Sequence, residues 1–343
     1  MNTSIDPKQV SRFKQLIGES QKAVIVPHIN PDGDAIGSCL ACRHLLTAMG
    51  KTATVVIPNE YPDFLQWIDG SSEVIDFERE TQRAQAVMKA VDTLFVLDFN
   101  NFERSEGMAD ELNGFEGRSI LIDHHPGPVA VCDLLISYPE VNSTCELFFR
   151  LVEAAGFLAY IGRNAAEAIF TGMMTDTGNF SYNASDPETY RIIAKLLEKG
   201  IDKDQVHSNV YHTFSEDRWR LIGHSLKDKM VILPEYRTGY ISLSREEMER
   251  FNYQPGDTEG LVNYPLMVKD IVFCIFFYEK DDVVKVSLRS KGAFSVNQFS
   301  REHFNGGGHN NAAGGRSELS LNEAIDYFLK VLPAYRDQLL ASS

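Results

Sequence analysis

Short apolar runs alternate with segments of helical periodicity through the first part of the chain. Four runs rich in β-branched residues predict strands, and two segments with apolar residues every three or four positions predict helices. The strand-like runs are 23–28, 52–57, 94–98 and 119–123, and the helical segments are 35–49 and 81–90. Near-continuous apolar strands that alternate with helices indicate an α/β fold, with a mostly parallel sheet covered on both faces. In such sheets, functional residues gather at the carboxyl ends of the strands.

The pattern changes in the second half of the chain. Ser143 and Thr144, with Glu146, predict a capped start to a run of helical segments, and strand-like segments follow this run. The strand-like segments 271–278 and 283–288 are separated by a short charged turn, which predicts a hairpin. The expected organisation is an α/β domain over 1–190, a helical linker over 191–225 and a smaller α/β domain over 226–343.

The composition is acidic and otherwise ordinary for a soluble protein. The 343 residues include 33 Lys and Arg against 48 Asp and Glu, a formal net charge of −15. A protein that binds long duplex nucleic acid needs a broad basic face, so we do not expect that partner. No stretch approaches the roughly 18 apolar residues of a membrane span. The first residues lack the apolar core of a secretory signal, and five cysteines do not indicate a disulfide framework. We therefore expect a reduced, cytoplasmic protein without a membrane partner.

A histidine and two carboxylates follow the first predicted strand. His28 precedes Asp32 and Asp34, and Pro31 and Gly33 permit the sharp turn that would bring the three side chains together. The other interpretation is that an Asp caps the following helix. A cap accounts for one carboxylate and leaves His28 and the second Asp unexplained. From this segment alone, metal binding and capping are equally open.

Two later strands also end in candidate ligands. Asp98 closes the run LFVLD, where an acid is also common as a loop cap. Asp123, His124 and His125 follow one another at the end of the run SILID and its turn. Adjacent histidines point in different directions, so one can bind a metal while the other faces a substrate. The alternative for this pair is a solvated loop.

A fourth candidate lies at the end of an apolar helix. Gly178 follows Asp176 and is suited to end a helix, so an ordinary C-terminal turn is one interpretation. An Asp at this end opposes the helix dipole, and a cation beside it would offset that cost. Together the four segments offer oxygen and imidazole ligands without cysteine: His28, Asp32, Asp34, Asp98, His124 and Asp176.

This donor set suits hard divalent cations. Oxygen and imidazole ligands favour Mn²⁺ or Mg²⁺, with Co²⁺ or Zn²⁺ as alternatives. Six ligands exceed what one ion usually takes from a protein, and they fit two ions that share one carboxylate. We therefore expect two divalent metal ions as cofactors, with Mn²⁺ favoured.

The motifs occur in an order that resembles a known family. The segments HINPDGDAIGS, VLD, DHH and TDTG resemble the four motifs of the DHH phosphoesterases, which are named after the triplet found here at residues 123–125. The C-terminal half resembles the DHH-associated domain through the segments 287–291 and 304–314. The resemblance covers nearly the whole chain. Within the family, the chain is most similar to the nanoRNase and pAp-phosphatase subgroup.

The resemblance implies a role for each motif residue. The implied ligands are His28, Asp32 and Asp98 for one ion, and Asp34, Asp98, His124 and Asp176 for the other. Asp98 would therefore bridge the two ions. His125 and Arg104 would contact the scissile phosphate, and Asp123 would orient a histidine without binding a metal. His125, Asp98 and Asp123 are thus the expected catalytic residues.

A glycine run near the C-terminus is the expected contact to the rest of the substrate. Gly306, Gly307 and Gly308 let backbone N–H groups approach an anion closely. Arg289 and His309 would add side-chain contacts, because Arg can bind a phosphate through two hydrogen bonds. Taken alone, a glycine run would favour a flexible surface loop.

These expectations describe a metal-dependent phosphoesterase whose substrate lies between its two domains. A hydroxide activated by two metal ions would attack phosphorus. The expected substrates are short single-stranded RNA, degraded to mononucleotides, and 3′-phosphoadenosine 5′-phosphate (pAp), converted to AMP. The alternatives are a cyclic- or linear-dinucleotide phosphodiesterase, a RecJ-like single-strand exonuclease and, from another class, a nucleotide sensor without catalysis. A homodimer is compatible with the sequence.

Overall fold

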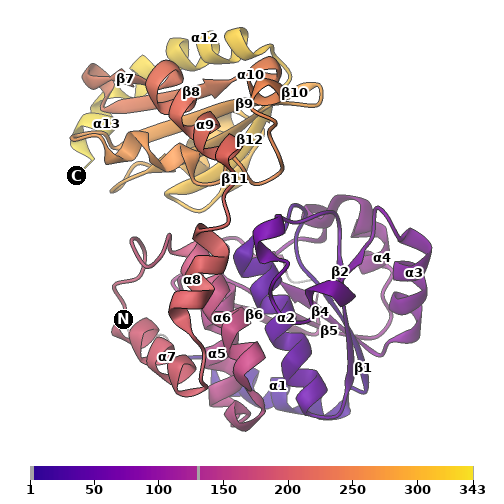
Figure 1. The fold of residues 1–343 in the computed structure, drawn as a ribbon. Helices are drawn as coiled ribbons and strands as arrows, with labels where there is room; N and C mark the ends of the chain where they lie inside the picture. Colours follow the sequence, from indigo (N-terminus) through magenta and orange to yellow (C-terminus); the bar gives the residue numbers. More distant parts are fainter. Residues whose placement is uncertain (1–3, 130–131, 343) are drawn as a thin grey trace. The chain divides into compact units, whose positions relative to one another are not determined.

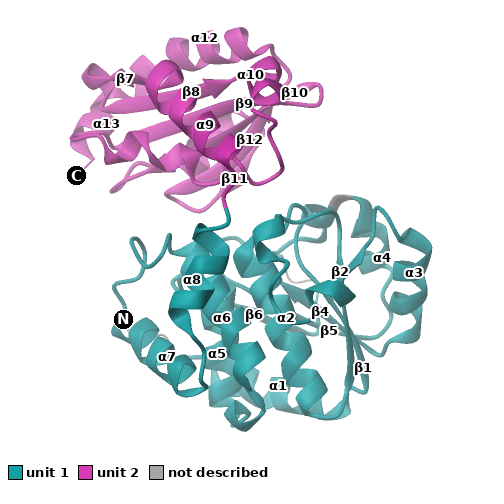
Figure 2. Ribbon diagram, in the orientation of Figure 1, with its two compact units in different colours: residues 1–213 teal, residues 214–343 magenta. Residues whose placement is uncertain are grey.

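Residues 4–129 and 132–342 are described by a computed structural model, and they divide between two units (Figure 2). The units are Met1–Thr213 and Phe214–Ser343. The segment expected as a helical linker contributes to both of them. Helix α8 (Lys203–Tyr211) belongs to the first unit, and α9 (Glu216–His224) belongs to the second.

The N-terminal unit is built on the parallel sheet that the apolar runs predict (Figure 1). Its strands are β1 (Lys22–Val26), β2 (Thr52–Ile57), β3 (Ile75–Asp76), β4 (Thr93–Leu97), β5 (Arg118–Asp123) and β6 (Leu134–Ser137). They lie in the order β3-β2-β1-β4-β5-β6, and neighbouring strands pair in parallel. The strand order reverses between β1 and β4, which is where open α/β sheets place their ligands.

Helices cover both faces of this sheet (Figure 1). They are α1 (Pro7–Glu19), α2 (Gly33–Ala48), α3 (Thr81–Ala90), α4 (Ala109–Asn113), α5 (Thr144–Ala154), α6 (Arg163–Asp176), α7 (Pro187–Glu198) and α8. Alternate residues of the central strands enter different parts of the core. Ile25 and Phe95 pack with α1, α2, α5 and α6, whereas Val24 and Leu94 pack with α3 and α4. Burial on both faces therefore explains why these strands are apolar at nearly every position.

The C-terminal unit contains a second sheet of six strands, in the order β11-β12-β10-β9-β8-β7. The strands are β7 (Val231–Leu233), β8 (Thr238–Leu243), β9 (Phe273–Lys280), β10 (Val283–Ser290), β11 (Gly307–Gly308) and β12 (Ala312–Ser317). The predicted hairpin forms between β9 and β10, with Lys280 opposite Val283. Among the pairs described, β8 and β9 run parallel and the others antiparallel.

Four helices accompany α9 in this unit: α10 (Arg245–Arg250), α11 (Val296–His303), α12 (Leu321–Val331) and α13 (Arg336–Ala341). They pack on a core rich in aromatic rings, in which Phe273, Phe277 and Phe299 all contact Phe328. Each unit therefore has its own hydrophobic core, and the expected α/β fold class is confirmed for both.

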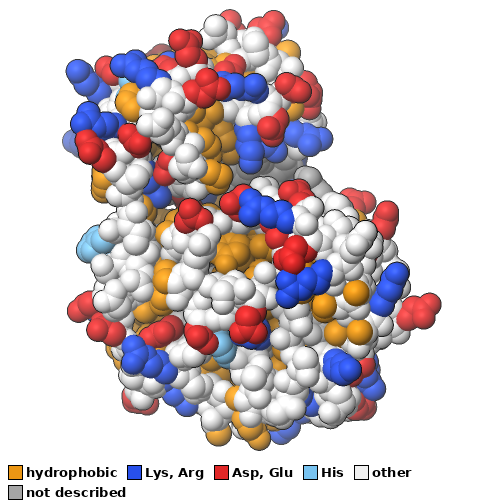
Figure 3. Space-filling view, turned by 45° about the vertical axis from the view of Figure 1, so that its right-hand side comes forward, with side chains coloured by type: hydrophobic (Ala, Val, Ile, Leu, Met, Phe, Trp, Pro, Cys, Tyr) orange, Lys and Arg blue, Asp and Glu red, His pale blue; other side chains and the backbone are white. Residues whose placement is uncertain are grey.

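Charged side chains of both signs are interspersed on the face of the molecule drawn in Figure 3. This mixture agrees with the formal net charge of −15, which gives no reason to expect a broad basic face. In the described ranges, no helix has both the length and the apolar character needed to cross a membrane.

Candidate active site

Asp32 caps the helix that follows β1. One oxygen of its carboxylate accepts the backbone N–H groups of Asp34 and Ala35, each at 3.0 Å. These two donors belong to the first turn of α2, where helical N–H groups have no partner within the helix. The capping interpretation of this segment is therefore correct. It does not exclude a ligand role, because the cap occupies Oδ1 of Asp32.

His28 meets Asp32 and Asp98 at the carboxyl ends of β1 and β4. One potential ligand atom from each of the three lies within 4.8 Å of the others. Nδ1 of His28 lies 2.7 Å from the carbonyl oxygen of Ile29. Because a carbonyl only accepts hydrogen bonds, Nδ1 carries the proton and Nε2 is the atom that can bind a cation.

Asp34 is held by the start of another helix. Its two oxygens accept the backbone N–H groups of Thr144 at 2.6 Å and Cys145 at 2.9 Å, which begin α5. Only 2% of Asp34 is exposed. Burial raises the pKa of its carboxyl well above the usual range, and the charges of Asp98 and Asp176 act in the same direction. A negative charge here therefore needs a nearby cation.

Asp98 lies at the centre of the site and has an unusual backbone. Its φ of 68° is left-handed, a conformation that few non-glycine residues adopt and that Asp tolerates better than most. Oδ2 lies 3.4 Å from Nε2 of His28, and Oδ1 lies 3.6 Å from Nε2 of His124. Although burial acts to raise it, the contact with His28 and the charges of the neighbouring histidines hold the pKa of Asp98 well below its usual range.

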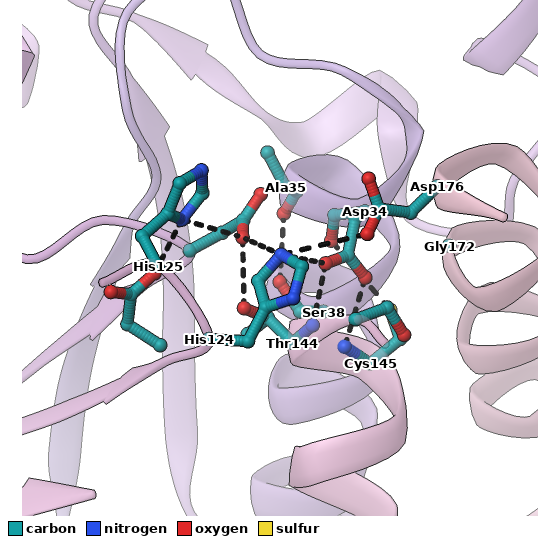
Figure 4. A network of polar contacts seen from close by, with 12 residues as sticks. Asp34, Ala35, Ser38, His124, His125, Thr144, Cys145, Gly172 and Asp176 are labelled. Carbon is teal, nitrogen blue, oxygen red and sulfur yellow. Dashed lines mark hydrogen bonds and ion pairs between the residues drawn. The ribbon is translucent and has the colours of Figure 1, made fainter. Parts of the chain in front are cut away.

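His124 faces three carboxylates, and two of them, those of Asp34 and Asp176, are labelled in Figure 4. Its Nε2 lies 3.5 Å from Asp176, 3.6 Å from Asp98 and 3.8 Å from Asp34, while Nδ1 lies 3.1 Å from the carbonyl oxygen of Val141. Burial lowers the pKa of this imidazole, but the three carboxylates outweigh burial and raise the pKa to about 9. The carboxylates therefore create a position that attracts positive charge, either a proton or a cation.

His125 turns away from His124, and the two rings meet edge to face. Its Nδ1 lies 2.7 Å from Asp123, which is fully buried, and 3.7 Å from Asp98. Asp123 is thus placed to orient His125. Burial lowers the pKa of His125, and the charge of Arg104 acts in the same direction. The carbonyl oxygen of Arg104 accepts the N–H of Ile29, the residue after His28, at 2.9 Å.

The described residues include groups of side chains that could hold a divalent cation. Two of these groups are His28, Asp32 and Asp98, and Asp34, His124 and Asp176. Asp98 contacts a histidine of each group. The six side chains offer carboxylate oxygen and imidazole nitrogen atoms, and none offers sulfur. Mn²⁺ and Mg²⁺ accept such oxygen and nitrogen donors. The structure thus brings together the six residues on which the sequence motifs converge.

The sequence did not reveal the neighbours that hold these carboxylates. The capped helix start at Ser143 and Thr144 was predicted, and the structure confirms it as the start of α5. Its position next to Asp34 and Asp98 depends on contacts across more than forty residues of sequence. The sequence signal at this position is the helix cap alone, which is sufficient to explain Ser143 and Thr144 without a partner elsewhere in the chain.

Gly172 permits the close packing beneath the site. A Cβ atom at this residue of α6 would lie 2.2 Å from Sγ of Cys145 and 2.8 Å from Oδ1 of Asp34. Figure 4 shows Gly172 beside both residues. Without a side chain at this position, α6 approaches α2 and α5 closely enough to complete the surroundings of Asp34.

The other predicted substrate contacts belong to the C-terminal unit. Arg289 lies on β10, and Gly307 and Gly308 form β11, paired antiparallel to β12. The N–H groups of Gly306, Gly308 and His309 already donate to Ser300, Asn297 and Ala312 within this unit. The glycines here permit close backbone contact, since a Cβ at Gly306 would lie 1.9 Å from the carbonyl oxygen of Gly314. Their role in phosphate binding stays a prediction.

The sequence matches two family descriptions. One is the DHH family, N-terminal domain, over residues 22–173, and the other is the DHHA1 domain, over residues 240–335. The first match contains five of the six potential ligands and ends three residues before Asp176. The second contains Arg289, the glycine run and His309.

Three similar proteins cover nearly the whole chain. The bifunctional oligoribonuclease and PAP phosphatase of Thermus thermophilus is 29% identical over 333 residues, which are 95% of this chain and 94% of that protein. The cyclic-di-AMP phosphodiesterase of Bacillus subtilis is 28% identical over 94% of this chain and 49% of its own length. A crystal structure of an exopolyphosphatase-related protein from Bacteroides fragilis is 42% identical, with a TM-score of 0.94 and 99% of both chains covered.

Proposed function

The chain belongs to the DHH family and is a hydrolase of phosphoester bonds, and we propose that it uses two metal ions to degrade short RNA to mononucleotides, to convert pAp to AMP, or both. The observation that carries the two-metal proposal is Asp98, whose oxygens lie 3.4 Å from His28 and 3.6 Å from His124. The substrate proposal is supported by the Thermus relative, because the similarity spans nearly its full length.

The six clustered side chains divide the binding of two cations between them. His28, Asp32 and Asp98 would hold one ion, and Asp34, Asp98, His124 and Asp176 would hold the other. When bound, divalent cations supply positive charge to the phosphoryl oxygens and lower the pKa of water, so that hydroxide is available near neutral pH. The Nδ1–H groups of His28 and His124 are directed to carbonyl oxygens, which leaves their Nε2 atoms for the cations.

The remaining polar residues would bind the substrate or orient a residue that binds it. Asp123 accepts a hydrogen bond from Nδ1–H of His125 at 2.7 Å and thereby orients the ring, so that Nε2 would face the substrate. Arg104 would stabilise charge on the equatorial oxygens of the transition state. In the C-terminal unit, Arg289, His309 and the glycine run would bind the rest of the substrate.

A cyclic dinucleotide is the second candidate substrate. The specific observation in its favour is the similarity of 94% of this chain to a cyclic-di-AMP phosphodiesterase. The first cleavage of a cyclic dinucleotide would give a linear dinucleotide. Short RNA and cyclic dinucleotides would therefore share the last step, the hydrolysis of a linear dinucleotide to mononucleotides.

The deciding experiment measures turnover of a substrate panel after removal of metals. The panel contains pAp, oligoribonucleotides of two to ten residues and cyclic dinucleotides, each tested with EDTA, Mn²⁺ and Mg²⁺. We expect no hydrolysis after chelation and recovery with Mn²⁺, because the ligand atoms are oxygen and imidazole nitrogen. Relative kcat/KM values across the panel then identify the substrate.

Full turnover in excess EDTA, with elemental analysis showing a metal-free protein, would contradict the proposed mechanism. Binding of the nucleotides without hydrolysis under every metal condition would instead identify a nucleotide sensor.

A further inference from the structure

We propose that Thr144 is a positioning residue that sets both ion sites at once, because it holds a ligand of each group. This inference rests on the proposed two-metal centre. Two different atoms of Thr144 take part, its hydroxyl and its backbone nitrogen, and each contacts a different carboxylate.

The contacts are short and shielded from solvent. The hydroxyl of Thr144 donates to Oδ1 of Asp98 at 2.8 Å, and its N–H donates to Oδ2 of Asp34 at 2.6 Å. Thr144 has no exposed surface, and Asp34 and Asp98 are each 2% exposed. Solvent therefore cannot easily replace either hydrogen bond, and its loss would leave a buried acceptor with one partner fewer.

The start of α5 makes this double contact possible. Ser143 is the N-cap, with an extended backbone at φ −162° and ψ 156°, and its hydroxyl accepts the N–H of Glu146 at 3.0 Å. Thr144 is therefore the first helical residue, and its N–H has no partner within the helix. The helix dipole also favours a carboxylate at this end.

The same residue thus fixes the distance between the carboxylates of Asp34 and Asp98. Asp98 would serve both ions, so a displacement of its oxygen changes both sites. Residues that hold metal ligands in place without touching the metal typically contribute 10- to 100-fold to metal affinity. We expect that range for the loss of the Thr144 hydroxyl.

The test is calorimetric titration of the full-length, metal-free protein with Mn²⁺. Thr144→Val removes the hydroxyl and keeps the N–H and nearly the same volume, and we expect 10- to 100-fold weaker binding of both ions. Thr144→Ser keeps the hydroxyl and should bind within about threefold of the wild type, since its contact with Asp98 is retained. Thr171→Val is the matched control, because Thr171 is equally buried and its hydroxyl donates to the carbonyl of Glu167.

A second pair of variants changes the hydroxyl and keeps the backbone N–H that donates to Asp34. Thr144→Ser and Thr144→Ala form this pair, which differs in the hydroxyl, for use if the Val variant does not fold.

Wild-type affinity for both ions in a folded Thr144→Val protein would overturn the inference, as would an equal loss in Thr171→Val. Failure of the wild-type protein to bind Mn²⁺ would instead overturn the proposed metal centre. The two failures are therefore distinguishable in a single set of titrations.

Discussion

At the scale of single residues, Asp98 combines demands that few residue types can meet. It follows a buried strand, adopts a left-handed backbone at φ 68°, and presents its two oxygens to histidines of different ligand groups. Asp and Asn tolerate this backbone better than most residues do. Asp98→Asn therefore keeps the conformation and removes the charge.

We expect Asp98→Asn and Asp98→Ala to lower kcat at least ~10²-fold, and more than Asp32→Ala does, because Asp98 would serve two ions. The measurement is kcat on a dinucleotide at saturating Mn²⁺, with bound metal quantified in each preparation. Near wild-type turnover of Asp98→Ala alongside an inactive Asp32→Ala would show that Asp98 does not bridge.

The residues of the site were predictable where a short sequence motif contains them. Asp98 and His124 were identifiable because their motifs occur in the order found in the DHH phosphoesterases, although each residue taken alone also has an ordinary explanation. Thr144 was not identifiable as a partner of Asp98, because it lies 46 positions away in sequence. Its local pattern also has a sufficient explanation as a helix start.

At the scale of elements, the contact between α2 and α6 depends on the absence of a side chain at Gly172. We expect Gly172→Ala to lower the free energy of unfolding by about 1–3 kcal/mol, because its Cβ would lie 2.2 Å from Cys145 and 2.8 Å from Asp34. Denaturant unfolding of the metal-free protein measures this effect. Gly18→Ala is the control, because open space surrounds Gly18 in α1 and the change should stabilise by up to ~1 kcal/mol.

An equal response of the two variants would contradict the close approach of α6 to Asp34. A loss of stability in Gly172→Ala without any loss of Mn²⁺ affinity would restrict the role of this packing to the fold.

Whole helices and strands were predictable where apolar residues recur at the spacing of a helix or fill both faces of a strand. The parallel strands were recognisable because residues such as Ile25 and Val24 are buried on opposite faces of the sheet. The glycine run was not recognisable as a strand. Gly307 and Gly308 pair with Gly314 and Ala313 of β12. The residues of the glycine run do not themselves indicate this pairing, because it depends on a strand that comes later in the sequence.

At the scale of the whole molecule, the potential metal ligands and the other predicted substrate contacts belong to different units. The six ligands predicted from the sequence all precede residue 180, whereas Arg289 lies on β10 of the C-terminal unit. Chemistry and substrate binding should therefore separate by mutation.

We expect Arg289→Ala to lower kcat/KM for a dinucleotide or pAp roughly 10- to 150-fold, because a charge-assisted phosphate contact contributes about 1.5–3 kcal/mol. Hydrolysis of a small artificial phosphodiester and the metal content should stay nearly unchanged. Arg316→Ala is the control, because Arg316 is an exposed arginine of the same sheet. Equal losses of Arg289→Ala on both substrates would mean that Arg289 takes part in the chemical step.

The confinement of the potential ligands to one unit also has a consequence for folding. A cation bound by Asp34, His124 and Asp176 would connect distant points of the chain and would bind the folded state in preference to the unfolded one. Each ion should then stabilise the N-terminal unit by about 2.7 kcal/mol when its free concentration is 100 times the dissociation constant. The C-terminal unit should gain nothing.

Each unit contains one tryptophan that can report its unfolding by fluorescence: Trp67 in the N-terminal unit and Trp219 in the C-terminal unit. In Trp219→Phe, the emission of Trp67 should report a melting transition that Mn²⁺ moves to higher temperature. In Trp67→Phe, the transition reported by Trp219 should not move. A shift of both transitions would mean that the two units unfold cooperatively, and the metal would then act as a thermodynamic link along the entire polypeptide.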